Sequence, residues 1–205
     1  MKNLGILLSG RGSNFEAIAR NVVEGRIADA RVAVVISNRT DAGGIEIARG
    51  LGLTALVIPS KGKDRAEHDR DVVAALQQYK VDLVCLAGYM RLLSPWFVKQ
   101  FPRRILNIHP SLLPAFPGLE AQEQAFAYGV KASGCTVHFV DEELDHGPII
   151  LQKAVPVLDT DDEQTLAARI LEQEHVAYSE AINVVLGGKF EVVGRRVVTA
   201  TAKHT

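Results

Sequence analysis

Short apolar segments alternate with longer amphipathic segments along the first half of the chain. Five segments have the length and β-branched content of strands, at residues 3–9, 31–37, 54–59, 81–87 and 104–109. Their nearly continuous apolar character is typical of parallel strands covered on both faces. Three intervening segments have helical periodicity, at residues 14–25, 44–52 and 64–80. This alternation predicts an α/β fold, an open and mostly parallel twisted sheet with helices on both faces.

The second half of the chain has a different order of elements. A helical pattern is followed by two strand-like segments that we expect to form an antiparallel pair, at residues 120–129, 134–140 and 148–157. A long helical pattern then covers residues 160–188, where Thr160 and Glu163 have the spacing of a capping box. Residues 197–205 form a tail that we expect to fray at its tip.

Start signals and segment lengths suggest how the chain is organised. Asp64 and Glu67 are spaced as a helix start signal at the beginning of the pattern over residues 64–80. No linker or low-complexity segment interrupts the chain, and its length fits one domain. We therefore expect a single domain over residues 1–205, with a lobe at residues 1–100, a lobe at residues 101–205, and the seam near residues 100–103.

Composition excludes several classes of protein. The 205 residues are 47% hydrophobic and 23% charged, with a formal net charge of -1, so overall charge gives no support for nucleic-acid binding. No segment approaches the roughly 20 apolar residues of a membrane span, and the first residues lack a secretory signal. Cys85 and Cys135 lie in apolar runs and outside any CxxC pair, which favours buried, reduced thiols. We expect a soluble cytoplasmic protein.

Polar residues gather where predicted strands end. In open α/β sheets, ligands bind outside the carboxyl ends of the strands. Four unusual segments follow strands, "SGRGSN" (9–14), "AGYMRLL" (87–93), "NIHPS" (107–111) and "DEELDHGP" (141–148). We expect them to converge on one site.

The segment "SGRGSN" joins a strand to a helix. Its glycines let backbone N–H groups approach an anion, and the helix dipole favours negative charge there. The GxGxxN pattern departs from GxGxxG, and no acidic residue ends the second strand, so a single phosphate is favoured over a dinucleotide. The alternative is a tight turn in which Ser13 and Glu16 cap the helix.

Asn107 and His109 lie on one face of the fifth strand, because strand side chains alternate. An amide and a protonated imidazole can together stabilise an oxyanion in acyl transfer. Asp145, if close to His109, would favour the imidazolium or order a water for proton transfer. The alternatives are buried polar residues with satisfied hydrogen bonds and, for Asp145, a solvated surface carboxylate.

The other histidines have weaker claims to a function. His138 precedes the segment that contains Asp145 and could approach the site, whereas His146 is expected to be exposed. His68 and His175 lie in helical patterns, where we expect them to pack or face water, and His204 lies in the tail. No HExxH or other ligand spacing indicates a metal site, and Ser111 lacks the GxSxG context of a nucleophile.

The segments "NIHPSLLPAFPG" (107–118), "LAGYMRLLS" (86–94) and "VHFVDEELDHGPIILQ" (137–152) closely resemble the motifs of the folate-dependent phosphoribosylglycinamide formyltransferases. "SGRGSN" and "QEH" (173–175) occur where that family has its own. The resemblance implies transfer of the formyl group of 10-formyltetrahydrofolate, the co-substrate, to the amine of 5-phosphoribosylglycinamide in de novo purine (IMP) biosynthesis. Transfer would be direct, through a tetrahedral intermediate, with no metal.

The resemblance also implies roles for individual residues. Asn107, His109 and Asp145 match the catalytic set. The lobe at residues 1–100 would bind nucleotide and phosphate, and the lobe at residues 101–205 would hold the catalytic and folate-binding residues. Positions that match phosphoribosylglycinamide contacts are Gly12, Ser13, Asn14, Leu171 and Glu174, with Leu171 at a position often polar in relatives. Positions that match folate contacts are Arg65, Met90, Arg91, Leu92, Leu93, Asn107, Asp141, Glu142, Glu143, Leu144 and Asp145. Ala115 replaces a lysine found in some relatives.

Several other functions remain open at this point. Two resemble the same core: methionyl-tRNA formyltransferase, which adds a tRNA-binding domain, and 10-formyltetrahydrofolate deformylase, a hydrolase that usually adds a regulatory domain. Two come from other classes: a nucleotide-binding Rossmann oxidoreductase and a non-catalytic nucleotide-binding protein. We expect small-molecule substrates only, with no nucleic acid or membrane partner, and a monomer or homodimer.

Overall fold

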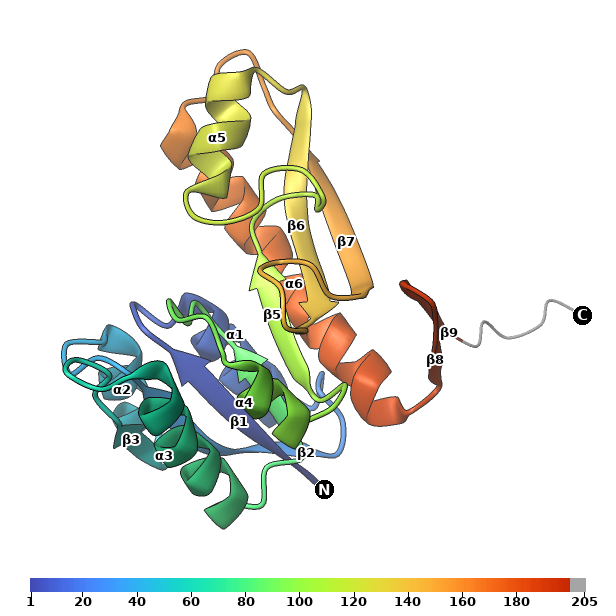
Figure 1. Cartoon of the computed structure of the whole chain (residues 1–205). Coiled ribbons are helices and arrows are strands. Elements are labelled where there is room, and N and C mark those ends of the chain that lie inside the picture. The colour runs from blue at the N-terminus through green and yellow to red at the C-terminus, as the bar shows by residue number, and fades with distance from the viewer. Residues whose placement is uncertain (200–205) are drawn as a thin grey trace, which may run out of the picture. The chain divides into compact units, whose positions relative to one another are not determined.

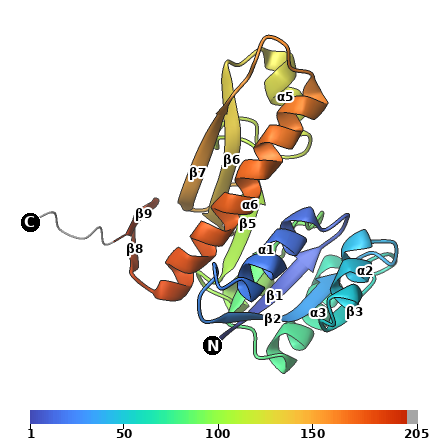
Figure 2. The same cartoon turned by 180° about the vertical axis from the view of Figure 1, so that it is seen from behind.

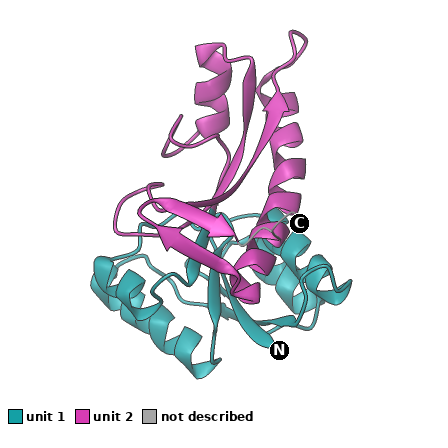
Figure 3. Ribbon diagram, turned by 90° about the vertical axis from the view of Figure 1, so that its right-hand side faces the viewer, with its two compact units in different colours: residues 1–107 teal, residues 108–205 magenta. Residues whose placement is uncertain are grey.

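The computed structural model describes residues 1–199 and divides into two compact units (Figure 3). The N-terminal unit is residues 1–107, and the C-terminal unit is residues 108–205. The expected frayed tip and His204 lie outside the described residues. The expected boundary between lobes, at residues 100 and 101, stays a prediction.

The N-terminal unit contains a parallel sheet with the strand order β3-β2-β1-β4-β5 (Figure 1). Its strands are β1 (Lys2–Leu8), β2 (Ala30–Ser37), β3 (Ala55–Val57), β4 (Leu83–Leu86) and the first part of β5 (Ile105–His109). The apolar run of β1 is fully buried from Leu4 to Leu8, as expected for a strand covered on both faces. The predicted parallel α/β arrangement is confirmed.

Helices cover both faces of this sheet. They are α1 (Ser13–Val23), α2 (Gly43–Gly50), α3 (Arg65–Gln78) and α4 (Pro95–Gln100). In Figure 1, α4 lies in front of β1, and in Figure 2, viewed from behind, α1 lies in front of it. The predicted start of α3 is confirmed, because the Asp64 carboxylate accepts a hydrogen bond from the Glu67 N–H at 2.7 Å.

The sequence pattern did not predict α4, which is only six residues long. The helix forms because Ser94 caps it, accepting a hydrogen bond from the Phe97 N–H at 3.2 Å, and because Pro95 suits the first turn. Phe97 is its buried anchor.

The C-terminal unit is built on an antiparallel pair of strands, β6 (Ala132–Phe139) and β7 (Ile149–Pro156). This pairing confirms the sequence prediction. The long helix α6 (Glu163–Gly187) packs on both strands, and α5 (Ala121–Tyr128) contacts α6. A stripe of buried apolar residues holds α6 to the sheet, namely Leu166, Ile170, Ala177, Tyr178, Ala181 and Ile182.

The predicted capping box of α6 is wrong by two residues. The N-cap is Asp162, which accepts from the Thr165 N–H at 2.8 Å, and the Asp162 N–H donates to the Thr165 hydroxyl at 3.0 Å. A threonine three residues after the cap replaces the expected Glu163, because its hydroxyl can reach back to the cap backbone.

The strands β8 (Phe190–Val193) and β9 (Arg196–Thr199) form a hairpin that the sequence pattern did not predict. Its strands are four residues each, too short for a clear alternation. None of the helices within residues 1–199 combines the length and apolar character that a membrane crossing requires.

Candidate active site

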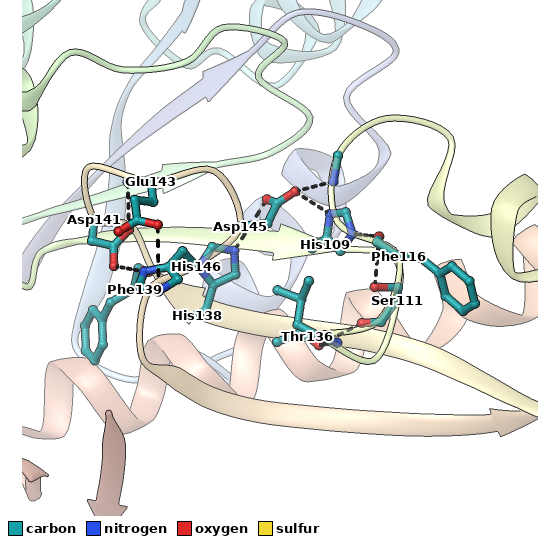
Figure 4. Close-up of polar contacts among 12 residues, drawn as sticks. His109, Ser111, Phe116, Thr136, His138, Phe139, Asp141, Glu143, Asp145 and His146 are labelled. Atoms are coloured by element: carbon teal, nitrogen blue, oxygen red, sulfur yellow. Dashed lines mark hydrogen bonds and ion pairs between the residues drawn. The ribbon is translucent and has the colours of Figure 1, made fainter. Parts of the chain in front are cut away.

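His109 and Asp145 meet in the C-terminal unit (Figure 4). The His109 Nδ1 atom is 3.3 Å from the Asp145 Oδ2 atom, and the two side chains are only 5% and 7% exposed. His109 ends β5, whereas Asp145 lies in the loop between β6 and β7. The burial of Asp145 rules out the alternative of a solvated surface carboxylate.

The second ring nitrogen of His109 also faces an acceptor. Its Nε2 atom is 2.8 Å from the Phe116 carbonyl oxygen. A carbonyl and a carboxylate can only accept, so an imidazole protonated on both nitrogens can donate to both. The contacts of His109 therefore suit the imidazolium that oxyanion stabilisation requires.

The loop at residues 110–118 contacts both members of this pair. In addition to the Phe116 carbonyl, the Gly118 N–H donates to Asp145 Oδ2 at 2.8 Å. This N–H helps to orient the carboxylate toward His109. Phe116, Gly118 and Asp145 all have positive φ angles, 52°, 87° and 49°. Such angles at non-glycine residues are uncommon and tend to occur at functional sites.

Thr136 on β6 holds the same loop in place. Its hydroxyl donates to the Ser111 carbonyl at 2.7 Å and accepts from the Leu113 N–H at 3.0 Å. Gln152 on β7 donates to the Thr136 hydroxyl and to the Leu113 carbonyl, both at 2.9 Å. The Ser111 hydroxyl donates to the Ala115 carbonyl at 2.5 Å. This buried network fixes the loop that contacts His109 and Asp145.

His138 also lies beside Asp145. Its Nε2 atom is 3.8 Å from Asp145 Oδ1, and its Nδ1 atom is 2.8 Å from the Phe139 carbonyl oxygen, to which it can donate. Burial lowers the pKa of His138, while the Phe139 contact and the Asp145 charge oppose that shift. The structure thus places a largely buried third side chain next to the pair, as the position of His138 in the sequence suggested.

The rest of the loop between β6 and β7 forms a second cluster (Figure 4). The His146 Nδ1 atom lies 2.8 Å from Asp141 Oδ2, and its Nε2 atom lies 3.9 Å from Glu143 Oε2. His146 is half-buried rather than exposed as predicted, because Asp141 and Arg195 contact it. Glu142 and Leu144 are exposed. Within residues 1–199, no three His, Cys, Asp or Glu residues gather closely enough to hold a metal ion.

In the N-terminal unit, the glycine-rich segment leads directly into α1. The N-cap is Gly12, with φ at 87°, and no side chain caps the helix. The alternative in which Ser13 and Glu16 cap α1 is therefore wrong, because the helix already begins at Ser13. A Cβ at Gly12 would lie 2.7 Å from the Gly44 Cα atom, so only glycine fits. The start of α1 can present its first N–H groups, including those of Ser13 and Asn14, to an anion.

The segment Met90–Leu93 follows β4 in the same unit. Met90 and Leu92 are 66% and 44% exposed, while Leu93 is buried and Arg91 half-buried. Arg65 is the first residue of α3 and is exposed. Exposed apolar side chains in a loop can form one wall of a site for an aromatic ligand.

Two expected substrate residues lie on α6. Leu171 and Glu174 are three residues apart, on one side of the helix, with Leu171 half-buried and Glu174 buried. Burial, with a smaller contribution from the Glu174 charge, raises the pKa of the Cys135 thiol to about 12. Cys135 is therefore an inert buried thiol, as the sequence predicted.

Asn107 is the last residue of the N-terminal unit and is half-buried. It pairs with Leu86 of β4 in the parallel ladder. Asn107 and His109 are alternate residues of β5, so their side chains leave the strand on the same side.

Some parts of this arrangement carried no signal in the sequence. The Phe116 carbonyl and the Gly118 N–H are backbone groups, and residue type does not reveal their use. Thr136 lay in an ordinary strand pattern. A hydroxyl on the face of β6 that carries His138 was the only available hint of its role.

Comparison with known proteins places these observations in context. Residues 2–182 match the formyl transferase family. The chain is 43% identical to the phosphoribosylglycinamide formyltransferase of Escherichia coli (strain K12), over 93% of this chain and 90% of that protein. It is 46% identical to the trifunctional purine biosynthetic protein adenosine-3 of Drosophila melanogaster, over 91% of this chain but only 14% of that much longer protein.

Solved structures show the same likeness. The crystal structure of glycinamide ribonucleotide transformylase 1 from Symbiobacterium toebii matches with a TM-score of 0.94 and 54% identity, over 97% of this chain and 94% of that chain. A formyltetrahydrofolate deformylase from Pseudomonas syringae pv. tomato matches with a TM-score of 0.90 but 27% identity, over 97% of this chain and 65% of that chain. The open α/β architecture is common to both.

Proposed function

The chain belongs to the formyl transferase family, and we propose that it transfers the formyl group of 10-formyltetrahydrofolate to the amine of 5-phosphoribosylglycinamide. This step belongs to de novo purine biosynthesis. The observation that carries the proposal is the buried contact between His109 and Asp145, 3.3 Å apart, at the end of a strand that also carries Asn107. The similarity to named phosphoribosylglycinamide formyltransferases supports it.

Catalysis follows from the hydrogen-bond donors at the end of β5. The substrate amine attacks the formyl carbon, and negative charge develops on the formyl oxygen in a tetrahedral intermediate. The imidazolium of His109 and the amide of Asn107 donate to that oxygen. Because this charge appears mainly in the transition state, the donors lower the barrier rather than only strengthening binding.

Asp145 has two roles in this mechanism. Its carboxylate orients the His109 ring and balances the positive charge of the imidazolium, since it lies against Nδ1. As the tetrahedral intermediate collapses, the bond from carbon to the folate nitrogen breaks, a proton leaves the new amide nitrogen, and a proton reaches the departing nitrogen. Asp145, directly or through a water, relays this proton.

The Phe116 carbonyl oxygen lies 2.8 Å from His109 Nε2 and can accept its hydrogen. One carbonyl oxygen can replace another as acceptor. We therefore propose that the formyl oxygen displaces the Phe116 carbonyl from His109 when the substrates bind. This exchange leaves the contact with Asp145 intact.

The remaining predicted residues bind the two substrates. The N–H groups of Gly12, Ser13 and Asn14 hold the phosphate of phosphoribosylglycinamide, and Glu174 contacts its ribose-phosphate part, beside Leu171. The folate residues are Met90, Arg91, Leu92, Leu93 and Arg65 in the N-terminal unit, with Asn107, and Asp141, Glu142, Glu143, Leu144 and Asp145 in the C-terminal unit. The sizeable exposure of Met90 and Leu92 supports a role in ligand contact.

A formyl-transfer assay tests this function. The absorbance of the folate is followed with and without phosphoribosylglycinamide. We expect turnover only with the acceptor, and we expect Asn107→Ala and His109→Ala to lower it by about 10²–10³. Formyl loss without the acceptor would indicate a deformylase instead, and wild-type turnover by both folded variants would contradict the mechanism.

We also propose that the reaction takes place in the cytoplasm. Cys85 and Cys135 are free, buried thiols, which suits the reducing cytoplasm. We propose small-molecule substrates only, without a nucleic-acid partner, and a monomer or homodimer, which light scattering during gel filtration can distinguish.

A further inference from the structure

Two buried side chains hold the ends of the Met90–Leu93 segment. At the first end, the Met90 N–H donates to the Ser9 hydroxyl at 2.8 Å. Ser9 is only 4% exposed and comes directly after β1. Its N–H donates to the Gly88 carbonyl at 3.0 Å, so backbone and side chain of Ser9 both bind the chain that leaves β4.

The other end of the segment is held by Asp69 on α3. The Ser94 N–H, directly after Leu93, donates to Asp69 Oδ2 at 2.8 Å. Asp69 is 1% exposed, so this carboxylate is taken out of water to bind a single loop. Burying a carboxylate is costly unless it receives hydrogen bonds. The Ser94 N–H supplies one such hydrogen bond to Asp69, at the end of the Met90–Leu93 segment.

Ser9 is itself held from the neighbouring strands. Its hydroxyl donates to the Asn38 side-chain oxygen at 2.5 Å, and the Asn38 amide donates to the Ser60 hydroxyl at 3.2 Å. Asn38 comes directly after β2, and Ser60 follows β3. Met90 is therefore held directly by Ser9, the Ser9 hydroxyl is oriented by Asn38, and Ser60 lies one hydrogen bond further from the segment.

Between the two held ends, the backbone is left open. Within residues 1–199, the N–H and carbonyl groups of Arg91, Leu92 and Leu93 make no hydrogen bond to protein. Buried Leu93 anchors the segment, while Met90 and Leu92 remain exposed. A short, fixed stretch of free backbone donors and acceptors beside exposed apolar side chains suits a flat heterocycle with polar groups along one edge.

We propose that Ser9 and Asp69 are positioning residues for the formyl donor, because they fix the Met90–Leu93 segment before the ligand arrives. This inference rests on the proposed function, in which that segment contacts the folate. Neither residue touches the ligand. Each lowers the ordering cost of binding by holding one end of the segment.

The test compares variants that remove each hydrogen bond with variants that keep it. Ser9→Ala and Asp69→Ala should raise the KM for 10-formyltetrahydrofolate by about tenfold and leave kcat within about twofold, since pre-organised binding is lost but the reacting groups are not. Asp69→Asn retains an acceptor for the Ser94 N–H and should restore most of the KM. For Asp69→Ala, the KM for phosphoribosylglycinamide should change by less than about twofold.

Two control variants separate positioning from general weakening of the fold. Ser60→Ala removes the hydrogen bond between Asn38 and Ser60 and leaves the contact between Ser9 and Met90 in place. Ser94→Ala removes the side-chain cap of α4 but keeps the Ser94 N–H that Asp69 binds. Both should keep the wild-type KM for the formyl donor. Thermal unfolding of every variant confirms that it is folded under assay conditions.

A binding measurement keeps the inference testable apart from turnover. Trp96, the single tryptophan of the chain, lies two residues after Ser94 and is partly exposed. Quenching of its fluorescence by tetrahydrofolate should give a weaker Kd for Ser9→Ala and Asp69→Ala than for the wild type and both controls. Unchanged Kd and KM in the folded variants would overturn the inference. Absent formyl transfer by the wild type would overturn the proposed function, while the tetrahydrofolate titrations would still decide the roles of Ser9 and Asp69.

Discussion

The imidazole of His109 is held between the carboxylate of Asp145, 3.3 Å from Nδ1, and a backbone carbonyl 2.8 Å from Nε2. Both ring nitrogens thus face acceptors in a largely buried environment. The same carboxylate oxygen that contacts His109 receives the Gly118 N–H. One loop therefore orients both members of the pair, His109 through the Phe116 carbonyl and Asp145 through the Gly118 N–H. Transition-state stabilisation depends on such accurate placement of the reacting groups.

Replacing Asp145 by asparagine tests the role of its charge. The amide oxygen of the new side chain can still accept from the Gly118 N–H, but the uncharged amide no longer balances the positive charge that the His109 imidazolium carries in the proposed mechanism. We expect Asp145→Asn to lower kcat by about 10² or more, with a small change in either KM. Steady-state formyl-transfer kinetics measure this. Asp159→Asn, at an exposed carboxylate paired with Lys131, is the matched control and should keep wild-type activity; an equal loss in both variants would contradict the role of Asp145.

Thr136 should affect both stability and activity, because its hydroxyl joins three partners in the buried network under the catalytic loop. Thr136→Val keeps the shape but leaves these partners unpaired, so we expect a loss of about 1–3 kcal/mol in the free energy of unfolding. The loop would also hold Phe116 and Gly118 less firmly, lowering kcat. Urea unfolding and turnover measure the two effects. Thr136→Ser keeps the hydroxyl and should lose less of each; if serine is as harmful as valine, the hydrogen bonds are not the cause.

Gly12 and Gly25 offer a matched pair for the glycine-rich segment. Both have positive φ angles, 87° and 73°, but a Cβ at Gly12 would collide with Gly44, whereas Gly25 has open space around it. Alanine at either position incurs the cost of left-handed backbone, about 1 kcal/mol. Only Gly12→Ala should also displace the start of α1 and raise the KM for phosphoribosylglycinamide. Kinetics with that substrate varied check this, and equal effects of the two variants would remove Gly12 from the phosphate site.

The sequence predicted most of the fold because the strands of the N-terminal unit are buried on both faces. Apolar runs such as residues 3–9 have few other interpretations, and the helix start at Asp64 depends on a local hydrogen bond. The short helix α4 and the β8–β9 hairpin escaped prediction, since elements of four to six residues show too little periodicity. The cap of α6 was misplaced because Thr160 and Asp162 are both suitable capping residues.

The candidate site was only partly predictable from the residues. The spacing of Asn107 and His109 placed them on one side of a strand, and strand-end rules brought Asp145 into consideration. Its 3.3 Å contact with His109 depends on the path of a loop, which no local pattern determines. The backbone groups of Phe116 and Gly118 and the network under Ser9 were not predictable for the same reason, because tertiary packing selects them.

The start of α6 should make the stability of the protein sensitive to acid. Asp161 and Arg169 form a bidentate pair, with both nitrogen–oxygen distances at 2.7 Å, and the Leu158 N–H also donates to Asp161. The hydrogen bonds from Arg169, then that from Leu158, hold the pKa of Asp161 well below its ordinary value of 3.8. A carboxyl with a lowered folded-state pKa adds stability that is present above the unfolded-state value and is lost as the pH falls below it.

Asp161→Asn should therefore be less stable than the wild type at pH 7, and the difference should shrink as the pH falls through about 4. Urea unfolding of both proteins across this range measures the effect. Asp159→Asn, whose carboxylate pairs with Lys131 at the surface, is the control and should show almost no difference at any pH. A constant difference between Asp161→Asn and the wild type at every pH would mean that the pair acts through packing rather than through the ionised carboxylate.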